Sequence, residues 1–383
     1  MSWIINPTIT INGASYLGSA VGSVSIDYGR TTVWDSQRVG YSRIQLINTN
    51  NTNFPIDINH SVQITVRNSA NSANIVVFTG TVASVANEGR VSTATSTIAY
   101  VTISAVSNLS ILAKIQSGAV AYPAETESAR ITRILNETTV VKDVIDPGTY
   151  TLLARNAGTA DALTLCNAYA GTATAAIYET KTGAVGYANE DRRNQDVLAN
   201  GYFAISPTFI PANGISSQRS QGDVINSVKV GYNNGSSVTV TSSGSVATYG
   251  TIAATIETDI SNEPNATALA NVYIGMRAYP KTSLSSIEVR VDNPTMGSVV
   301  RDKMLNMYFG LPIQIAGLPL TVSATTYFGF VEGWNLSFSQ LAAKITLRTT
   351  EKTYSFRTTQ WEDAAPAQRW LDVGAAIQWL QYE

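Results

Sequence analysis

The run YGTIAATIETDISNEPNATALANVYIGMRAYPKTSLSSIEVRV, from Tyr249 to Val291, contains the patterns of a strand, a helix and a second strand. In residues 251–258 apolar residues alternate with polar or small ones, which is the pattern of a half-buried strand. Residues 284–291 alternate in the same way, so one face of this second strand can pack on the helix while the other stays polar.

The helix in this run has start and stop signals. Asn262 fits its N-cap, and Pro264 fits its first turn, where a missing N–H group costs nothing. Apolar residues then recur at helical spacing, at Ala266, Leu269, Tyr273 and Met276. Pro280 forbids continuation of the helix. The sequence therefore predicts a strand, helix and strand inside a chain that is otherwise dominated by strands.

Residues 1–118 read as strands and turns. The clearest strand covers residues 58–67, where His60 lies on the apolar face together with Ile58, Val62, Ile64 and Val66. Further strands are predicted over residues 8–13, 21–28, 42–48, 76–84 and 97–106, and Ser107 fits the cap of a short helix. Short strands at such close spacing favour a closed or sandwiched sheet over a parallel one.

Residues 119–222 change to mixed helix and strand. Residues 128–135 form a short amphipathic helix, and Thr159 fits the cap of a second helix. A hairpin follows with a turn that ends at Gly183, where glycine allows a positive φ. Residues 207–222 are rich in Pro, Gly, Ser and Gln, which predicts a linker into the next domain.

Residues 223–353 form a third, strand-rich region, which includes the run described first and strands over residues 328–333 and 343–348. The tail, residues 354–383, contains Trp361, Trp370 and Trp379. The end of this tail has apolar residues at helical spacing, and a terminal element must dock to stay ordered. Docking on its own chain and docking on a partner both remain open, since Trp is enriched at interface centres.

Composition limits the class of protein. At 383 residues the chain is long enough for two or three domains, and its charged residues are only 14%, with a formal net charge of −2. A tight binder of double-stranded nucleic acid needs clustered Lys and Arg, so that class is disfavoured. The single cysteine excludes an intrachain disulfide, and we expect folding in a reducing cytoplasm, without a secretion signal or membrane anchor.

Few residues offer catalytic or metal-binding chemistry. One histidine and one cysteine exclude two-histidine metal motifs and Cys-rich zinc sites, so only carboxylate metal sites remain. His60 would have to serve any Ser-His-Asp triad, but a satisfied, partly buried histidine is the ordinary reading of its position. Cys166 falls on a helix stripe with Ala162 and Tyr169, as a small hydrophobic residue does.

A pair of carboxylates for glycoside hydrolysis is the remaining enzymatic option, because such a pair only has to be close in space. The candidates are Glu257, Asp259, Glu362 and Asp363. All four also fit strand-edge, turn or tail positions at the surface, so the sequence predicts no enzyme, no cofactor and no metal.

The third region resembles a block found in hub proteins of long-tailed bacteriophage tail tips. The resemblance rests on Ala247-Thr-Tyr-Gly-Thr-Ile, residues 255–259, Asn265-Ala-Thr-Ala-Leu-Ala, Arg277-Ala-Tyr-Pro and the Ser-rich strand that follows. In the family this order reads as a Tyr-Gly pair, a strand, an Ala-rich helix, a corner and a strand. Asn271, Tyr273 and Gly275 stand where the family usually has larger helix residues. Residues 128–135 and the Gly183 hairpin are also similar to the middle domain of these hubs.

The resemblance implies a mainly β fold with α+β parts. It implies two tube-like β-barrels at residues 1–118 and 223–353, an intervening α/β domain at 119–222 and a short helical tail at 354–383. It also implies a homotrimer at the virion tail tip, with distal tail, tail-tube, tape measure and tip fibre or receptor-binding proteins as partners. Genomic DNA would pass through such a ring without sequence-specific binding, and assembly would occur in the cytoplasm of the host bacterium.

Two other classes stay open. A receptor-binding adhesin or distal tail protein is also rich in strands, Ser and Thr, and predicts glycan binding by exposed aromatic residues. A carbohydrate-active hydrolase predicts loss of activity when one carboxylate is removed. A hub predicts self-association into a ring.

Overall fold

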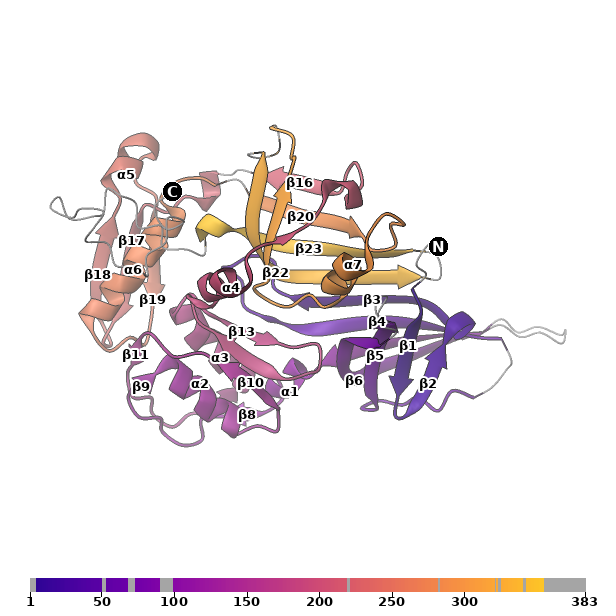
Figure 1. Ribbon diagram of the computed structural model, residues 1–383. Coiled ribbons are helices and arrows are strands. Elements are labelled where there is room, and N and C mark those ends of the chain that lie inside the picture. The colour runs from indigo at the N-terminus through magenta and orange to yellow at the C-terminus, as the bar shows by residue number, and fades with distance from the viewer. Residues whose placement is uncertain are drawn as a thin grey trace.

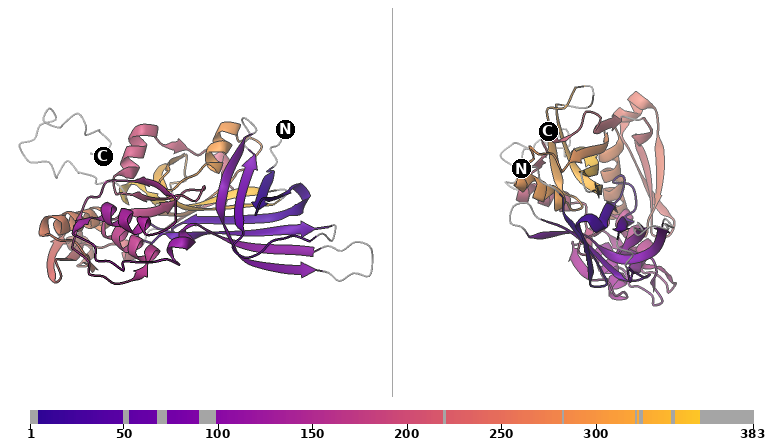
Figure 2. Two further views of the ribbon diagram at one scale, coloured as in Figure 1. Left: turned by 90° about the horizontal axis from the view of Figure 1, so that it is seen from below. Right: turned by 90° about the vertical axis from the view of Figure 1, so that its right-hand side faces the viewer.

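The computed structural model describes residues 5–49, 53–67, 73–89, 99–218, 221–281, 283–320, 322, 325–339 and 342–354. Over these ranges the protein is mainly β, and its largest unit is a 13-stranded sheet (Figure 1). The molecule is elongated: long strands of the first region extend from one end, and the helices gather toward the other (Figure 2).

The large sheet draws its strands from the first and the last thirds of the chain. The first third provides β1 (Pro7–Ile11), β2 (Ala14–Leu17), β3 (Val21–Gly29), β4 (Arg38–Asn48), β5 (Ser61–Arg67), β6 (Asn74–Gly89) and β7 (Ala99–Ser107). The last third provides β15 (Phe203–Ala204), β16 (Ile215–Gln218), β20 (Ser283–Arg290), β21 (Pro312–Ala316), β22 (Thr326–Ser339) and β23 (Ala343–Glu351). The strand order is β16-β20-β23-β22-β3-β4-β7-β6-β5-β1-β2, with β21 beside β22 and β15 beside β21.

The two sets of strands meet where β3 pairs antiparallel with β22, from Gly29 opposite Gly333 to Ser23 opposite Ser339. Residues 1–118 and 223–353 therefore contribute to one sheet. The described strands form no closed barrel, so the two separate barrels expected from the resemblance are not what their pairing gives. The alternation of apolar and polar residues was sufficient to predict each strand. It did not predict that a strand of the first third of the chain pairs with a strand of the last third.

The middle of the chain forms a smaller α+β unit that lies beside the large sheet (Figure 1). Its helices are α1 (Leu109–Leu112), α2 (Glu127–Asn136), α3 (Ala162–Thr172) and α4 (Arg192–Asn200). Its strands are β8 (Gln116–Ser117), β9 (Glu125–Thr126), β10 (Lys142–Ile145), β11 (Thr151–Leu152), β12 (Ala160–Asp161), β13 (Ala176–Glu179) and β14 (Val185–Ala188). The predicted hairpin is β13 and β14, and Gly183 in its turn has a φ of 87°.

The predicted strand, helix and strand are all present, but they serve two different sheets. β19 (Ala253–Glu257) and α6 (Glu263–Arg277) belong to a unit with β17 (Ser227–Tyr232), β18 (Ser236–Thr241) and α5 (Ser243–Tyr249). The Asn262 side chain accepts a hydrogen bond from the Asn265 N–H group at 3.0 Å, which confirms the predicted cap. The strand after the helix is β20 of the large sheet, and its buried Ile287 and Val289 do not pack with α6 as predicted.

Two hydrophobic cores explain this division. The first core joins residues of both halves of the large sheet and helix α7 (Ser298–Leu305). The second core joins the middle unit to β17 and α6, through residues that include Leu165, Tyr187, Val228 and Leu269. Full burial of one such side chain contributes about 1.5–3 kcal/mol relative to exposure, and this burial holds α6 against β17 and β18.

Three local predictions need correction. Ser107 does not cap α1, because its Oγ accepts a hydrogen bond from Gly40 N–H at 2.8 Å and Asn108 is the N-cap residue. Helix α3 is capped by Asp161 instead of Thr159, through a hydrogen bond from Thr164 N–H. Within the predicted linker, residues 207–222, β16 pairs antiparallel with β20 at the margin of the large sheet. The tail, residues 354–383, lies outside the described residues apart from its first residue.

Candidate functional site

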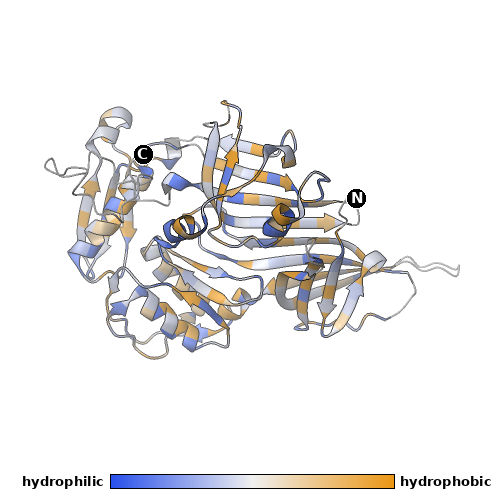
Figure 3. Ribbon diagram, in the orientation of Figure 1, coloured by the Kyte–Doolittle hydropathy of each residue, from blue (hydrophilic) through white to orange (hydrophobic). Residues whose placement is uncertain are grey.

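One face of the large sheet is lined by small polar and charged side chains. Residues directly opposite each other on neighbouring strands project to the same face. One such row crosses seven strands in the order Arg290, Lys344, Ser337, Ser25, Arg43, Ser104 and Ser84. The residues between them, such as Val24, Ile44 and Ile345, are buried in the core. The resulting alternation of hydropathy along the strands is visible in Figure 3.

This polar face is hollowed into a groove with a volume of about 560 Å³. Its polar lining comes from β3, β4, β7, β20, β22 and β23, and includes Ser23, Ser25, Arg43, Gln45, Thr102 and Ser337. The face therefore extends over both halves of the sheet and across the junction of β3 and β22.

The charges around the polar face are largely paired. Lys344 contacts Glu288 at 2.7 Å, Arg348 contacts Asp27 at 2.8 Å, and Arg290 contacts Asp292 at 2.8 Å. The hydrogen bond from Arg290 holds the pKa of Asp292 below its usual range. Charges of both signs on a face of serine and threonine give little net attraction for a polyanion such as DNA.

A β-bulge marks the junction between the two halves of the sheet. The register of β22 shifts between Val331 and Gly333, so Glu332 is the additional residue of the bulge. Opposite it, Gly29 ends β3 with a φ of 89°, and a Cβ on Gly29 would lie 2.3 Å from the Glu332 carbonyl oxygen. The turn of the chain then brings Arg30 N–H to the same oxygen at 3.0 Å. Glycine at position 29 thus permits the close crossing that places Arg30 beside Glu332.

Glu332 is fully buried and bridges two arginines. Its carboxylate accepts hydrogen bonds from Arg30 Nε at 2.7 Å and from an Nη group of Arg193 at 2.6 Å. Burial raises the pKa of Glu332, but Arg193 and Arg30 outweigh burial, and the net pKa lies below its ordinary value. Because Arg193 is in α4 and Arg30 follows β3, this buried cluster ties the middle of the chain to both halves of the sheet.

A cavity with a volume of about 540 Å³ lies against the Glu332 cluster. Arg30, Arg193 and Trp334 line it, together with the β13–β14 hairpin and the residues before β21. Lys181, in the turn of that hairpin, donates a hydrogen bond to the carbonyl of Leu305, and burial lowers its pKa to about 7. On the strand that leads into the turn, burial raises the pKa of Glu179 to about 7.

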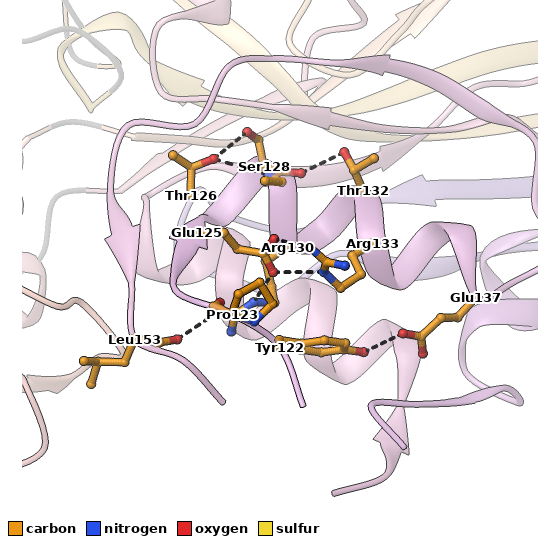
Figure 4. A network of polar contacts seen from close by, with 11 residues as sticks. Tyr122, Pro123, Glu125, Thr126, Ser128, Arg130, Thr132, Arg133, Glu137 and Leu153 are labelled. Carbon is orange, nitrogen blue, oxygen red and sulfur yellow. Dashed lines mark hydrogen bonds and ion pairs between the residues drawn. The ribbon is translucent and has the colours of Figure 1, made fainter. Parts of the chain in front are cut away.

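A second polar network surrounds the start of α2 (Figure 4). Arg130 donates to Glu125 at 2.9 Å and to the carbonyl of Leu153 at 2.8 Å, and Arg133 contacts the same Glu125 carboxylate at 2.8 Å. Burial raises the pKa of Glu125, but the hydrogen bonds from Arg133 and Arg130 outweigh it and the net pKa is lowered. Tyr122 lies beneath the Arg130 guanidinium, 5.3 Å from ring centre to Cζ. These partners hold the loops around α2 in place, which is a structural role.

His60 lies in the turn before β5 and not on the face of a strand, because β5 begins at Ser61 and Ile58 is 59% exposed. Its Nδ1 accepts a hydrogen bond from the Asp57 backbone N–H at 3.1 Å. The histidine of a Ser-His-Asp triad donates from Nδ1 to a carboxylate, so this geometry is the opposite of the one that a triad requires.

The other catalytic candidates within the described residues lie in a core or at the surface. Cys166 is fully buried on α3, as predicted, and burial raises the pKa of its thiol to about 12. Glu257 and Asp259 are exposed at the end of β19. Groups of three or more His, Cys, Asp or Glu side chains that suit a metal ion do not occur in the described ranges.

Trp361, Trp370 and Trp379, the predicted partner-docking residues, lie outside the described residues, as do Glu362 and Asp363. Across the described part of the chain, every helix is too short or too polar to span a bilayer.

Sequence reasoning did not identify the Arg30, Glu332 and Arg193 cluster. A signal was present, because Glu332 interrupts the apolar run Phe328-Gly-Phe-Val-Glu-Gly-Trp334. A glutamate in the middle of a buried strand requires cationic partners. Neither arginine has a neighbouring sequence pattern that marks it as that partner.

Sequence comparisons gave no relatives: no protein-family model matches the chain, and no curated protein matches it. Structural comparison, in contrast, found similar proteins. A tail protein from Neisseria meningitidis MC58 superimposes with a TM-score of 0.65 at 10% identity, over 92% of this chain and 98% of that protein. The 43 kDa tail protein of prophage MuSo2 from Shewanella oneidensis superimposes with a TM-score of 0.60 at 10% identity, over 91% and 99%.

A third solved structure extends the likeness beyond phages. It is an Escherichia coli component of the type VI secretion system, described as structurally similar to the bacteriophage T4 tail proteins gp27 and gp5. It superimposes with a TM-score of 0.51 at 10% identity, over 91% of this chain and 78% of that protein. The resemblance predicted from the third region is thus confirmed, and the chain has the fold of solved tail proteins, one of which comes from a prophage.

Proposed function

We propose that this protein is a non-enzymatic component of a phage tail tip, a trimeric hub whose polar sheet face lines the channel through which DNA leaves the virion. The observation that carries the proposal is the row of polar residues that crosses seven strands and both halves of the sheet. Two halves of the sheet per chain would give six around a threefold axis, which is the number needed to match a sixfold tail tube.

The ends of the sheet support closure into a ring. β5 pairs with β6 only over Asn74–Thr81, whereas β7 continues along β6 as far as Gly89. Among the described strands, residues 83–89 of β6 pair with β7 on one side and with no strand on the other. At the opposite margin of the sheet, β16 is the last strand. Open strand margins are templates for pairing with another chain, so β6 of one subunit is proposed to meet β16 of the next.

The paired charges of the polar face suit a passage for DNA. A protein that holds DNA tightly neutralises several phosphates with Lys and Arg, and each contact strengthens binding. Here Lys344 and Arg348 are already engaged by Glu288 and Asp27. The proposed partners are the tail-tube, distal tail, tape measure and tip fibre proteins, in a virion assembled in the host cytoplasm.

The first experiment measures the mass of the purified protein by light scattering and images the particles that form. A threefold ring with an axial hole is the expected result. A protein that stays monomeric over a wide concentration range and binds glycans would instead support the adhesin or distal tail alternative.

Disulfide cross-linking tests the arrangement of subunits directly. In a Cys166→Ser background, Ala86→Cys on β6 combined with Ser216→Cys on β16 should give covalent trimers on oxidation. Each single cysteine variant is the matched control and should remain monomeric on a denaturing gel. Trimers by light scattering without cross-links would retain the hub but reject this pairing of margins.

A further inference from the structure

The cavity beside the Glu332 cluster is large enough for an aromatic side chain. Its volume is about 540 Å³, within the range of small-molecule pockets. Tyr178 and Phe309 of its lining stack with ring centres 6.0 Å apart and planes 7° apart, and Trp334 supplies a further aromatic surface. Tyr308 also lines the cavity and is 41% exposed. Such rings offer apolar area to a flat side chain.

The charged side chains that line the cavity are of both signs. Glu332 contacts two of these side chains, Arg30 and Arg193. With Glu332 counted, the basic and acidic groups are equal in number among the described residues, so the cavity has no net charge to attract an ion. The charged lining residues are Arg30, Lys181, Arg192, Arg193, Asp143, Glu179 and Asp196.

Several of these charges already have partners in the protein. Arg192 pairs with Asp146, and the Tyr178 hydroxyl donates to Asp143 at 2.8 Å. The lining therefore favours an apolar group over an ion. Beside the aromatic rings, apolar side chains of the lining include Ile75, Val76, Ala176 and Met307.

The last described residues of the chain are held in place by two lysines. Lys281 Nζ donates to the Thr353 carbonyl at 2.7 Å. Lys352 Nζ lies 5.2 Å from the centre of the Phe328 ring in β22. The tail, residues 355–383, therefore continues from a fixed point beside β22.

A path of packed side chains leads from this point to the cavity. The Phe328 ring contacts Tyr202 with centres 4.8 Å apart, and Tyr202 contacts Phe330 with centres 6.3 Å apart. The Arg193 guanidinium then lies over both Phe330 and Phe309, 5.8 and 5.6 Å from the ring centres. Because Phe309 is part of the cavity wall, the start of the tail and the cavity are joined by one layer of side chains.

Chain length selects one tryptophan of the tail. From Phe328 to Trp334 of the cavity lining, β22 advances six residues, which is about 20 Å along a strand. Trp361 follows Tyr354 by seven residues, and these span at most about 23–25 Å. Trp361 therefore reaches the cavity when the chain before it is extended.

The other large aromatic residues of the tail fit the cavity less well. Phe356 is two residues from Tyr354 and reaches only about 7 Å. Trp370 and Trp379 fall in the segment with helical spacing, and a helix with its side chains is about 10–12 Å wide. A cavity of this volume accepts one side chain and not a helix.

We propose that the indole ring of Trp361 occupies this cavity in its own chain. The ring packs against Phe309 and covers Tyr308, and the tail runs over β22 between Lys352 and the cavity. A short tether gives the ring an effective concentration that is roughly millimolar, so even a weak contact is populated. This assigns one tryptophan of the tail to docking on its own chain instead of on a partner.

Acrylamide quenching of tryptophan fluorescence in the full chain tests burial. Trp361→Phe keeps an aromatic ring and removes one indole, so its difference from the unchanged protein isolates the emission of Trp361. This emission is expected at a shorter wavelength than the emission that Trp379→Phe removes, and it should be quenched several-fold less. Emission of Trp361 that is quenched as readily as in the unfolded protein would overturn the proposal.

Disulfide formation locates the ring. In a Cys166→Ser background, Glu362→Cys places a thiol next to Trp361, and Thr182→Cys places one in the cavity lining, where Thr182 is exposed. Oxidation should give an intrachain disulfide. Addition of Trp361→Ala should slow its formation roughly tenfold or more, because the tail loses its anchor. Trp379→Ala is the matched control and should leave the rate unchanged.

Two results of the oxidation experiment would reject the assignment. Covalent dimers on a denaturing gel, in place of the intrachain product, would assign the cavity to the tail of a second copy. A rate that is the same with and without Trp361 would show that the tail passes the cavity without binding it. Neither measurement depends on ring formation, so these failures would leave the proposed hub unaffected.

Discussion

Glu332 connects segments that are distant in the sequence through a single buried carboxylate. Arg30 and Arg193 approach it from 302 and 139 residues away. All three side chains are almost completely buried. An ion pair of this kind is weak evidence of net stabilisation, but removal of one member leaves the others uncompensated.

The variant Glu332→Gln should therefore be strongly destabilised, by about 3–5 kcal/mol at pH 7. Thermal unfolding followed by circular dichroism measures the effect. Glu288→Gln is the matched control, because Glu288 forms an exposed pair with Lys344, and such pairs contribute about 0–1 kcal/mol. Equal losses in the two variants would contradict a special role for the buried cluster.

The same residue sets an expected pH dependence. The folded-state pKa of Glu332 lies below its ordinary value of 4.5, so its stabilisation is present above that value and is lost as the pH falls through the folded-state pKa. The unchanged protein should lose stability more steeply than Glu332→Gln below about pH 4.5. Parallel pH profiles for the two proteins would show that Glu332 does not titrate in this way.

At the scale of elements, the crossing of β3 and β22 depends on the absence of a side chain. A Cβ on Gly29 would lie 2.3 Å from the Glu332 carbonyl oxygen, whereas a Cβ on Gly13 would meet nothing within 4 Å. The two glycines have similar positive φ angles, 89° at Gly29 and 82° at Gly13. The two positions therefore separate the effect of backbone strain from the effect of contact.

Gly13→Ala should cost about 1–2 kcal/mol, the strain of a left-handed conformation alone. Gly29→Ala should cost more than that, because the β3–β22 pairing must shift as well. Urea unfolding of the two variants measures the difference. Similar midpoints would indicate that the crossing adjusts without cost.

Individual elements were largely predictable from the sequence, because alternation and capping are local signals. Residues 262–277 are an example, since the cap at Asn262 and the end before Pro280 follow from single residues. The grouping of elements was not predictable, because the alternation in β3, β19 and β20 carries no information on which strand each one joins. The arginine cluster was missed for the same reason, since its members meet only in the folded chain.

At the scale of the whole molecule, the polar face makes the orientation of subunits testable. Arg43 is exposed in the middle of this face, between Ser25 and Ser104 on the neighbouring strands. If the face lines a channel, its side chains point to solvent in the assembled ring and tolerate a change of charge.

Arg43→Glu should thus leave stability within about 0.5 kcal/mol of the unchanged protein and leave the trimer intact. Light scattering and thermal unfolding measure both quantities. Loss of the trimer with an intact monomer would show that this face is buried between subunits, and the channel would then have to lie elsewhere.

The pairing of β3 with β22 also sets the order of events during synthesis. Asn335 of β22 bonds Ser25 of β3 across 310 residues, so β3 leaves the ribosome long before its partner exists. At roughly 5–20 residues per second this delay is about 15 to 60 seconds. Throughout that interval the nascent chain carries an incomplete sheet whose exposed strand can pair with other nascent chains. Cells that make many copies at once should therefore depend on chaperones to keep this margin covered until the C-terminal third has been translated.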